Sequence, residues 1–350
     1  MNMLFQTNIQ REGLKFYNVE EAPFRIYGVR KENGLFRRMP EAIAKSISER
    51  VYSTHTDCAG GRVRFVTDSP YLAIQTTGQY TKWSRFALGG SCGFSVYTEM
   101  CGRKRYAGSF APPFDVTEGY EGLIEFPEQG EKLVTLEMPL YSSVSGLLIG
   151  LKEGSILKKS PDYAIEKPVV FYGSSITQGG FASKSGSCYE SILSRQFDFN
   201  YINLGFASGA RAEDAMAEYI RQLDMSVFVY DYDHNAPNVE HLKNTHKKMF
   251  DIIREANPDL PIIMMSRPKY YLTEEEKQRF EVILDTYLSA KENGDANVYL
   301  ISGEKLMELV LDNGLADSTH PTDSGFFSMA KALADVIFNI FYNKGMLKKN

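Results

Sequence analysis

Short apolar runs alternate with polar positions over residues 51–151, and they are rich in Val, Ile, Tyr, Phe and Thr. This composition favours β-strands, and Gly, Pro, Asp and Ser break the runs at the spacing of a β-sandwich or jelly roll. We therefore predict an all-β, jelly-roll-like domain over residues 1–160, interrupted by a short helix within 39–51. Its predicted strands are RVRFVT, YLAIQTT, GFSVYTE, GLIEF, KLVTLEM and SGLLIGL.

The pattern changes after Pro168, where apolar strand-like runs alternate with amphipathic helical segments. This alternation is typical of an α/β domain built on a parallel sheet. We predict such a domain over residues 161–350, and the polar stretch 152–163 separates it from the first. The predicted strands are 169–172, 200–204, 225–231, 261–265 and 297–301, and the predicted helices lie near 189–197, 212–222, 239–255, 274–292 and 324–342.

Charge and hydropathy argue against nucleic acid and membranes as partners. The 350 residues carry a formal net charge of -5, and their Lys and Arg residues are scattered rather than clustered. Such a chain offers no basic surface for nucleic acid. The first 24 residues do not resemble a signal peptide, and no apolar stretch reaches the roughly 20 residues that span a bilayer. We expect a cytoplasmic protein without a membrane partner, whose oligomeric state stays open.

The cysteines do not form a metal-binding or disulfide pattern. Four are spread along the chain without a C-x-x-C pair, and His55 beside Cys58 has no matching second pair. We expect free thiols, and we assign no metal and no cofactor. The cysteines are Cys58, Cys92, Cys101 and Cys188.

A glycine-rich loop follows the first predicted strand of the α/β domain and reads 173-GSSITQGG-180. In open α/β sheets ligands bind outside the carboxyl ends of the strands, so chemistry is expected in these loops. The tight turn would expose Ser175, which is a candidate nucleophile. A serine in this place could equally be a helix cap.

A second candidate element, 317-DSTH-320, precedes the last predicted helix. It places a carboxylate three residues before a histidine in one loop. Histidine can take and return a proton near neutral pH, and a carboxylate on its other ring nitrogen fixes the tautomer. His320 and Asp317 gain significance from their pairing with Ser175, because a D-x-x-H loop alone is more often ordinary structure.

Two further loops follow strands at the same predicted edge. In 231-DYDHN-235, Asn235 could direct its amide at a developing oxyanion, whereas Asp233 and His234 are more often structural groups. In 203-NLGFASGAR-211, the glycines would permit a backbone N–H to face the same place.

Residues 168–340 resemble the SGNH, or GDSL-like, hydrolases, whose sequence blocks match in order. The resemblance implies a flavodoxin-like three-layer sandwich, with Ser175 as nucleophile and oxyanion donor and Asn235 as a second donor. It also implies Asp317 and His320 as the remaining catalytic pair. The matching blocks are 173-GSSI-176, 203-NLGFASG-209, 231-DYDHN-235 and 317-DSTH-320.

The chain departs from the family pattern at two places. Ser174 stands where the family has Asp, which leaves the chemistry intact. Ala207 is inserted in the glycine block, so either Ser208 or Gly209 supplies the backbone oxyanion N–H. The N-terminal region resembles, by pattern, the jelly-roll modules of bacterial carbohydrate esterases.

These observations predict a serine esterase for short acyl groups, most simply O-acetyl groups on a carbohydrate or small glycoside. The expected partner is a small-molecule or oligosaccharide ester. A lipase or thioesterase for longer chains is the alternative within the same chemistry, with Phe181 and Phe206 as apolar candidates. A non-catalytic sugar-binding protein is disfavoured, because Ser175, Asp317 and His320 are all present.

Overall fold

The computed structural model describes residues 3–347, and the chain divides into two compact units. The first unit contains the chain up to Met39 together with Thr56–Asp162 and Ala182–Gly186. The second unit contains Pro40–His55, Tyr163–Phe181 and the chain from Ser187 onward. Each unit therefore receives a short segment from the part of the sequence that builds the other.

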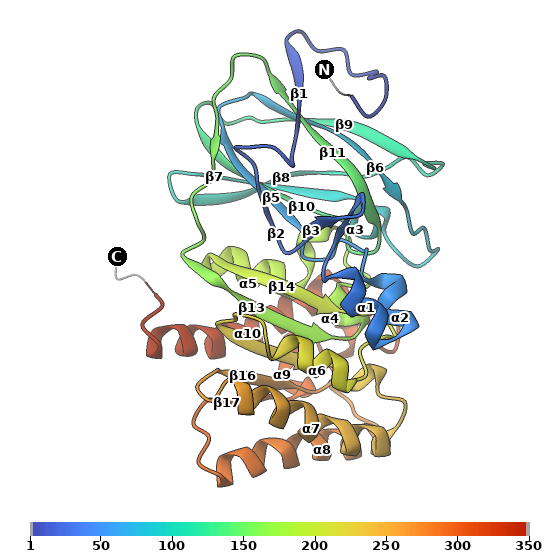
Figure 1. Ribbon diagram of the computed structural model, residues 1–350, viewed down its shortest axis with the longest axis vertical. Coiled ribbons are helices and arrows are strands. Elements are labelled where there is room, and N and C mark those ends of the chain that lie inside the picture. The colour runs from blue at the N-terminus through green and yellow to red at the C-terminus, as the bar shows by residue number, and fades with distance from the viewer. Residues whose placement is uncertain (1–2, 348–350) are drawn as a thin grey trace. The chain divides into compact units, whose positions relative to one another are not determined.

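The first unit consists mainly of two antiparallel sheets (Figure 1). Their strand orders are β1-β11-β6-β9 and β12-β5-β10-β7-β8, with β2 also paired to β5, and β3 and β4 form a separate ribbon. The elements are β1 (Leu14–Asn18), β2 (Arg25–Tyr27), β3 (Arg30–Glu32), β4 (Leu35–Arg37), β5 (Arg62–Thr67), β6 (Tyr71–Gln79), α3 (Leu88–Ser91), β7 (Phe94–Met100), β8 (Arg103–Phe110), β9 (Gly119–Glu125), β10 (Lys132–Glu137), β11 (Ser143–Lys152) and β12 (Leu157–Lys159).

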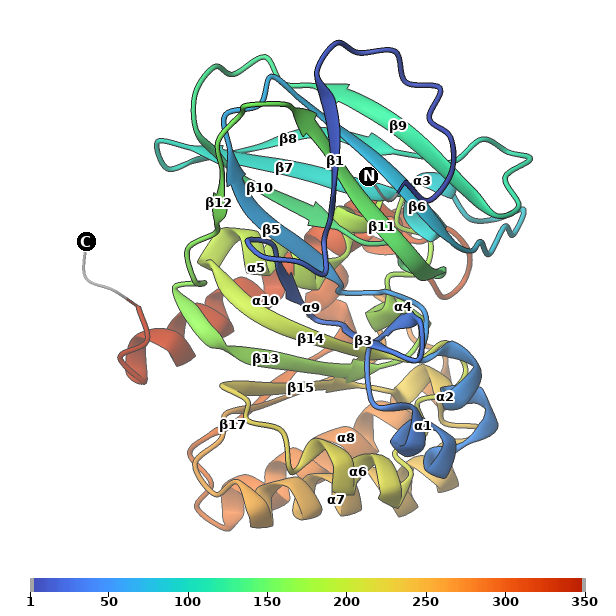
Figure 2. The same ribbon diagram turned by 45° about the horizontal axis from the view of Figure 1, so that its top comes forward.

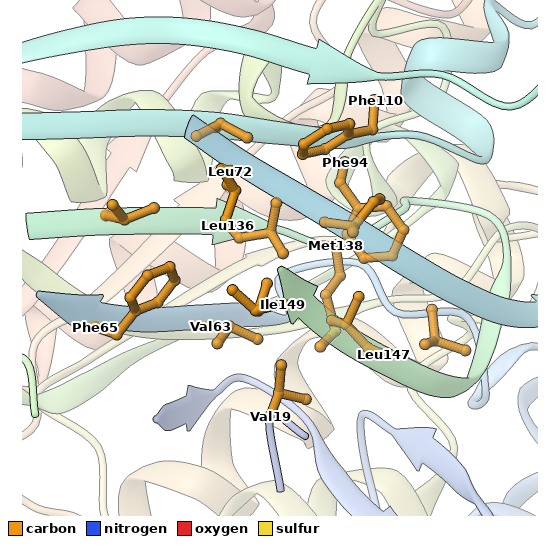
Figure 3. Packing of buried hydrophobic residues seen from close by; sticks show 14 of the residues in the cluster. Val19, Val63, Phe65, Leu72, Phe94, Phe110, Leu136, Met138, Leu147 and Ile149 are labelled. Atoms are coloured by element: carbon orange, nitrogen blue, oxygen red, sulfur yellow. The ribbon is translucent and has the colours of Figure 1, made fainter. Parts of the chain in front are cut away.

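The core of this unit is made by alternate residues from both sheets. Val63 and Phe65 on β5 and Leu147 and Ile149 on β11 belong to one buried apolar cluster (Figure 3). A spacing of two puts such residues on one face of a strand, so each sheet buries one face. The all-β character predicted for this region is confirmed, and the six predicted runs overlap β5, β6, β7, β9, β10 and β11.

The second unit is built on a five-stranded parallel sheet of order β14-β13-β15-β16-β17, which confirms the predicted fold class. Helices α5 and α10 lie on one face of the sheet, and α6, α7 and α8 lie on the other (Figure 2). The elements are α1 (Glu41–Ile47), α2 (Glu49–Thr54), β13 (Ile165–Gly173), α4 (Ser175–Gln178), α5 (Tyr189–Phe197), β14 (Phe199–Gly205), α6 (Asp214–Ile220), β15 (Val227–Asp231), the 3-10 turn η2 (Asp233–Asn235), α7 (Val239–Ala256), β16 (Ile262–Met265), α8 (Glu274–Glu292), β17 (Val298–Ile301), α9 (Gly303–Met307), the 3-10 turn η3 (Leu311–Gly314) and α10 (Asp323–Asn343).

The helical segment expected within residues 39–51 forms two helices, and both belong to the second unit. Ser48, in extended conformation, ends α1 and caps α2 by accepting the N–H of Val51. Helix α1 packs beside α6. The sequence predicted a helix here, but it could not show which unit the helix would join.

Helix α10 is long and apolar enough to cross a membrane by length and composition alone, although 56% of its most apolar window is buried inside the protein. Its buried residues Phe326, Met329, Leu333 and Ile337 recur every three or four positions. The helix packs against α5 and α9. Such a pattern is typical of a core helix of an α/β unit.

Helix α7 carries a fully buried histidine between the sheet and α8. The His246 ring stacks on Tyr230, with ring centroids 4.7 Å apart, and its Nδ1 lies 2.9 Å from Oγ1 of Thr286. Burial lowers the pKa of His246 to about 3. The folded protein therefore keeps this imidazole neutral at pH values where the unfolded chain, with a pKa of about 6.5, takes up a proton.

We predict that His246→Gln lowers stability at pH 7 and that its disadvantage relative to the wild type shrinks in acid. Below pH ~6, the wild type loses about 1.4 kcal/mol of this contribution per pH unit, and the variant has no such loss. Urea unfolding at pH 7, 6 and 5 measures the difference, in which titrations common to both proteins cancel. A difference that stays constant over this range would contradict a neutral His246.

Candidate active site

Three strand ends meet at one edge of the parallel sheet. Gly173 at the end of β13 is in register with Gly205 of β14 and Asp231 of β15. Immediately beyond the sheet, Phe206 N–H donates to Gly173 O at 2.9 Å, and Ser174 N–H donates to Asp231 O at 3.1 Å. The loops that carry the candidate residues are therefore tied together by backbone hydrogen bonds at their first residues.

Ser175 is the first residue of the one-turn helix α4, directly after β13. Ser174 caps this helix, because its Oγ accepts the N–H of Ile176 at 3.1 Å. Gly179 ends the helix in the left-handed region at φ 96°, a conformation that glycine adopts without strain. Ser174, which replaces the aspartate of the family block, thus fills a capping role that either residue type can serve.

The structure brings Ser175, His320 and Asp317 into one chain of hydrogen bonds. The Oγ of Ser175 lies 2.8 Å from Nε2 of His320. On the other side of the ring, Nδ1 lies 3.0 Å from Oδ2 of Asp317. Because a carboxylate only accepts, His320 carries its proton on Nδ1, and Nε2 is left to accept the Ser175 hydroxyl proton.

The Asp317 carboxylate is fixed by its own loop. Its Oδ1 accepts backbone N–H groups of Thr319 at 2.8 Å and His320 at 2.7 Å. Partial burial opposes ionisation, but these bonds and the His320 ring outweigh it and hold the pKa of Asp317 below its ordinary value. The D-x-x-H spacing therefore keeps Asp317 charged and oriented toward the ring.

The two phenylalanines that the sequence offered as apolar candidates occupy different environments. Phe181 stacks on the His320 ring, with centroids 4.8 Å apart and planes 26° from parallel. Phe206 is fully buried and belongs to the core of the unit. Only Phe181 is placed to contact a molecule beside His320.

Asn235 is held next to the glycine block. Its Nδ2 donates to the carbonyl of Phe206 at 2.8 Å. An amide nitrogen carries two hydrogens, and within residues 3–347 the second one has no acceptor. The turn η2 fixes the backbone of Asn235, whose N–H donates to Tyr232 O at 2.8 Å.

The backbone N–H groups of the glycine block are not equivalent. Ala207 N–H donates to Oε1 of Gln178 at 2.9 Å, and Gly209 N–H donates to Phe206 O at 2.9 Å. Ser208, exposed at the tip with φ 60°, has an N–H without an acceptor in the described part of the chain. Gly209, the other candidate from the sequence, has its N–H engaged and is not in the left-handed region.

The turn that carries Asn235 is anchored by ion pairs of Asp233. The buried carboxylate of Asp233 accepts Nε and Nη2 of Arg267 at 3.1 and 2.9 Å. Burial opposes its charge, but the guanidinium of Arg267 holds the pKa of Asp233 below its ordinary value. Arg279 donates to the carbonyls of Asp233 and Ala236 at 3.0 Å each. Asp233 is thus an anchor of the turn.

His234, in the same turn, stays neutral beside these charged groups. Burial, and then the charge of Arg267, lower its pKa to about 3. Its Nε2 is buried and has no hydrogen-bond partner among the described residues. A neutral imidazole in this environment is unsuited to serve as a general base.

A cavity of about 430 Å³ opens beside the oxyanion candidates. Ser208 and Asn235 both line it. The other lining side chains are almost all polar or charged, and Ala236 and Pro237 are the small apolar exceptions. The cavity can therefore receive a polar group of a molecule whose carbonyl oxygen lies at Ser208 and Asn235.

Two buried amides that join the loops were missed in the sequence. Gln178 binds Ala207, and Asn203 donates from Nδ2 to Thr177 O at 2.6 Å and accepts Gly205 N–H at 2.9 Å. Gln178 stands in the same turn as Ser175, which was the one available signal. Neither function follows from residue type, because the partners are distant in sequence.

No group of three or more His, Cys, Asp or Glu side chains that could hold a metal ion occurs within residues 3–347. The four cysteines are not in disulfide bonds.

Solved structures share this fold over nearly the whole chain. A protein assigned as a GDSL-like lipase from Bacteroides ovatus is 24% identical with a TM-score of 0.85, covering 94% of this chain and 98% of its own. A salicylyl-acyltransferase from a tetracycline biosynthetic pathway is 20% identical, with coverages of 95% and 98% and a TM-score of 0.74. An acetyl xylan esterase from Butyrivibrio proteoclasticus is 12% identical, with coverages of 96% and 100% and a TM-score of 0.61.

Sequence comparison assigns both parts of the chain. No curated protein matches it. Residues 14–157 match the model of the N-terminus of SGNH hydrolase-type esterases. Residues 166–338, which include all the candidate site residues, match the model of the GDSL-like lipase/acylhydrolase family. The region 166–338 belongs to the GDSL-like lipase/acylhydrolase family, and the chain is a hydrolase of the SGNH esterase type.

Proposed function

We propose that this enzyme hydrolyses short acyl esters, most simply O-acetyl esters of a carbohydrate or small glycoside, through an acyl-Ser175 intermediate. The observation that carries the proposal is the hydrogen-bonded sequence Ser175–His320–Asp317, with distances of 2.8 and 3.0 Å. This is the geometry in which a serine hydroxyl becomes a nucleophile near neutral pH.

The chemistry proceeds in two balanced steps. Ser175 Oγ attacks the ester carbonyl while His320 Nε2 takes the hydroxyl proton, and the tetrahedral species collapses as His320 returns that proton to the departing alcohol. Water then attacks the acyl-enzyme in the same manner, and the acid and free Ser175 are regenerated. Asp317 remains ionised throughout and stabilises the imidazolium that forms in each step.

The oxyanion of each tetrahedral species would be held by Ser208 N–H and the amide of Asn235, together with the backbone of Ser175. The support for Ser208 over Gly209 is that the Gly209 N–H already donates to Phe206 O. Donors that are fixed before the reaction stabilise developing charge without reorganisation.

The polar cavity supports a short acyl group and a polar alcohol. A long acyl chain would gain about 0.8 kcal/mol for each methylene moved from water into an apolar site, but this cavity offers few apolar walls. The aromatic ring stacked on His320 is that of Phe181, which fits a small group or a sugar ring beside the histidine. The acetyl xylan esterase of similar fold acts on such an ester, which is consistent with this proposal.

We predict that Ser175→Ala lowers kcat for 4-nitrophenyl acetate at least ~10³-fold, because it removes the nucleophile. Thermal unfolding should be nearly unchanged, since Ser175 lies in a turn rather than in the core. Ser174→Ala is the matched control: it removes a neighbouring hydroxyl and a cap, and should retain far more activity. Comparable rates for wild type and Ser175→Ala would refute the acyl-Ser175 route.

Asn235→Ala should lower kcat by about 10²-fold and leave KM almost unchanged, because a lost oxyanion donor is felt in the transition state. Asn293→Ala, at the far end of α8, is a control that removes an amide remote from the site. Steady-state kinetics on both variants measures the effect. Normal kcat in Asn235→Ala would remove this side chain from the mechanism.

Gln178 should act as a positioning residue, since its Oε1 engages Ala207 N–H and leaves the next one, that of Ser208, for the oxyanion. Gln178→Met, of similar size but without the acceptor, should lower kcat about 10- to 100-fold with little change in KM. Gln178→Glu keeps an acceptor oxygen and should recover much of that loss. Equal kcat values in the two variants would show that the acceptor has no such role.

A further inference from the structure

The cavity beside Ser208 and Asn235 is lined by three arginines and two glutamates, and both glutamates are already paired. Glu276 binds Arg267 at 3.1 Å and Lys269 at 2.9 Å. Glu275 binds Arg279 at 3.1 Å. The third arginine, Arg211, therefore gives the lining side chains one positive charge in excess.

Arg211 is held by its backbone and not by its side chain. Its N–H donates to the Glu213 carboxylate at 3.2 Å, and its carbonyl oxygen accepts from Nε2 of His241 at 2.9 Å. In the described part of the chain its guanidinium makes neither a hydrogen bond nor an ion pair, and the residue is exposed. The Arg211 charge also attracts the nearby Glu213 carboxylate, but without a hydrogen bond between the two side chains. A guanidinium with a fixed backbone and no hydrogen-bonded partner at a cavity wall is suited to a ligand.

A second guanidinium reaches the same loop. Arg50 of α2 donates from Nε to Ala207 O at 2.7 Å, directly before Ser208. Within residues 3–347 its two terminal nitrogens have no acidic partner. The loop that carries Ser208 is therefore flanked by two arginines whose charges are not neutralised by ion pairs.

We infer that the ester substrate carries a carboxylate, which Arg211 binds in the cavity beside Ser208 and Asn235. The inference rests on the proposed esterase function and adds an acidic group to its substrate. A planar guanidinium matches a carboxylate in a bidentate manner, and one excess charge suits a monoanion. The distance between the carboxylate and the ester is short, because the cavity adjoins the oxyanion donors.

The carboxylate could belong to the acyl group or to the alcohol, as in a uronic acid, and two substrate pairs separate these sources. The acyl pair is 4-nitrophenyl hydrogen glutarate and its methyl ester. The alcohol pair is an O-acetylated methyl glucuronoside and the matching methyl glucoside. Release of nitrophenol or acetate is measured for wild type, Arg211→Gln and Lys291→Gln.

In one of the two pairs the wild type should prefer the acid about tenfold in kcat/KM, and Arg211→Gln should lose that preference through KM. The preference should also fall as salt is added, because the guanidinium is exposed. Lys291→Gln removes the same charge at the far end of α8, about 27 Å along the helix from the cavity-lining Thr273, and should retain the preference.

Calorimetric binding of glutarate and of methyl glucuronoside to wild type and Arg211→Gln provides a readout that does not need turnover. If neutral esters are hydrolysed but neither acid is preferred, the inference is wrong and the proposed function stands. If no ester is hydrolysed but one acid binds in an Arg211-dependent way, the anion site stands and the proposed function is wrong. A preference that survives Arg211→Gln would overturn the role of Arg211.

Discussion

The candidate site depends on the backbone hydrogen bonds that join three loops just beyond the parallel sheet. Gly173 O accepts Phe206 N–H, and Asp231 O accepts Ser174 N–H, so the ends of β13, β14 and β15 are fixed relative to one another. Parallel strands bring their carboxyl ends to one edge of the sheet. The two hydrogen bonds also fix the first residue of each loop that follows. The turn that carries Ser175 and the loop that carries Ser208 are thus fixed to the end of the sheet.

Three carboxyl groups are buried near this edge of the sheet, and they differ in their protonation. Asp233 stays ionised because Arg267 and Arg279 surround it, whereas burial holds the pKa of Asp231 and Glu190 well above their usual range. Neither oxygen of Asp231 has a hydrogen-bond partner among the described residues. A neutral acid costs far less to bury than a carboxylate, so both groups are tolerated in the protein interior as neutral acids.

Much of the second unit could be predicted from the sequence, because its strands are continuous apolar runs and its helices are long and periodic. Helices α5 and α8 have the predicted bounds. In the first unit β8 was missed: Arg103–Phe110 begins RKRY, and this edge strand shows no apolar alternation. The exchange of Pro40–His55 and Ala182–Gly186 between the units was also missed, since periodicity shows that a face is buried but not against which partner.

The site was predictable where chemistry coincides with local spacing. The D-x-x-H loop contains both the carboxylate and the amides that fix it, so Asp317 and His320 could be recognised together. The choice between Ser208 and Gly209 could not be made, because it depends on a hydrogen bond to Phe206 O and on a left-handed φ. The role of Gln178 could not be predicted for the same reason, since its partner, Ala207, lies in another loop.

The most direct test of a nucleophilic Ser175 is covalent labelling with a fluorophosphonate, followed by mass spectrometry of the digested protein. Attack by Oγ on phosphorus expels fluoride and leaves a stable phosphonyl ester on the serine. The account predicts one labelled peptide in the wild type, modified at Ser175, slower labelling in His320→Ala and none in Ser175→Ala. Labelling at another serine, or equal labelling of Ser175→Ala, would contradict it.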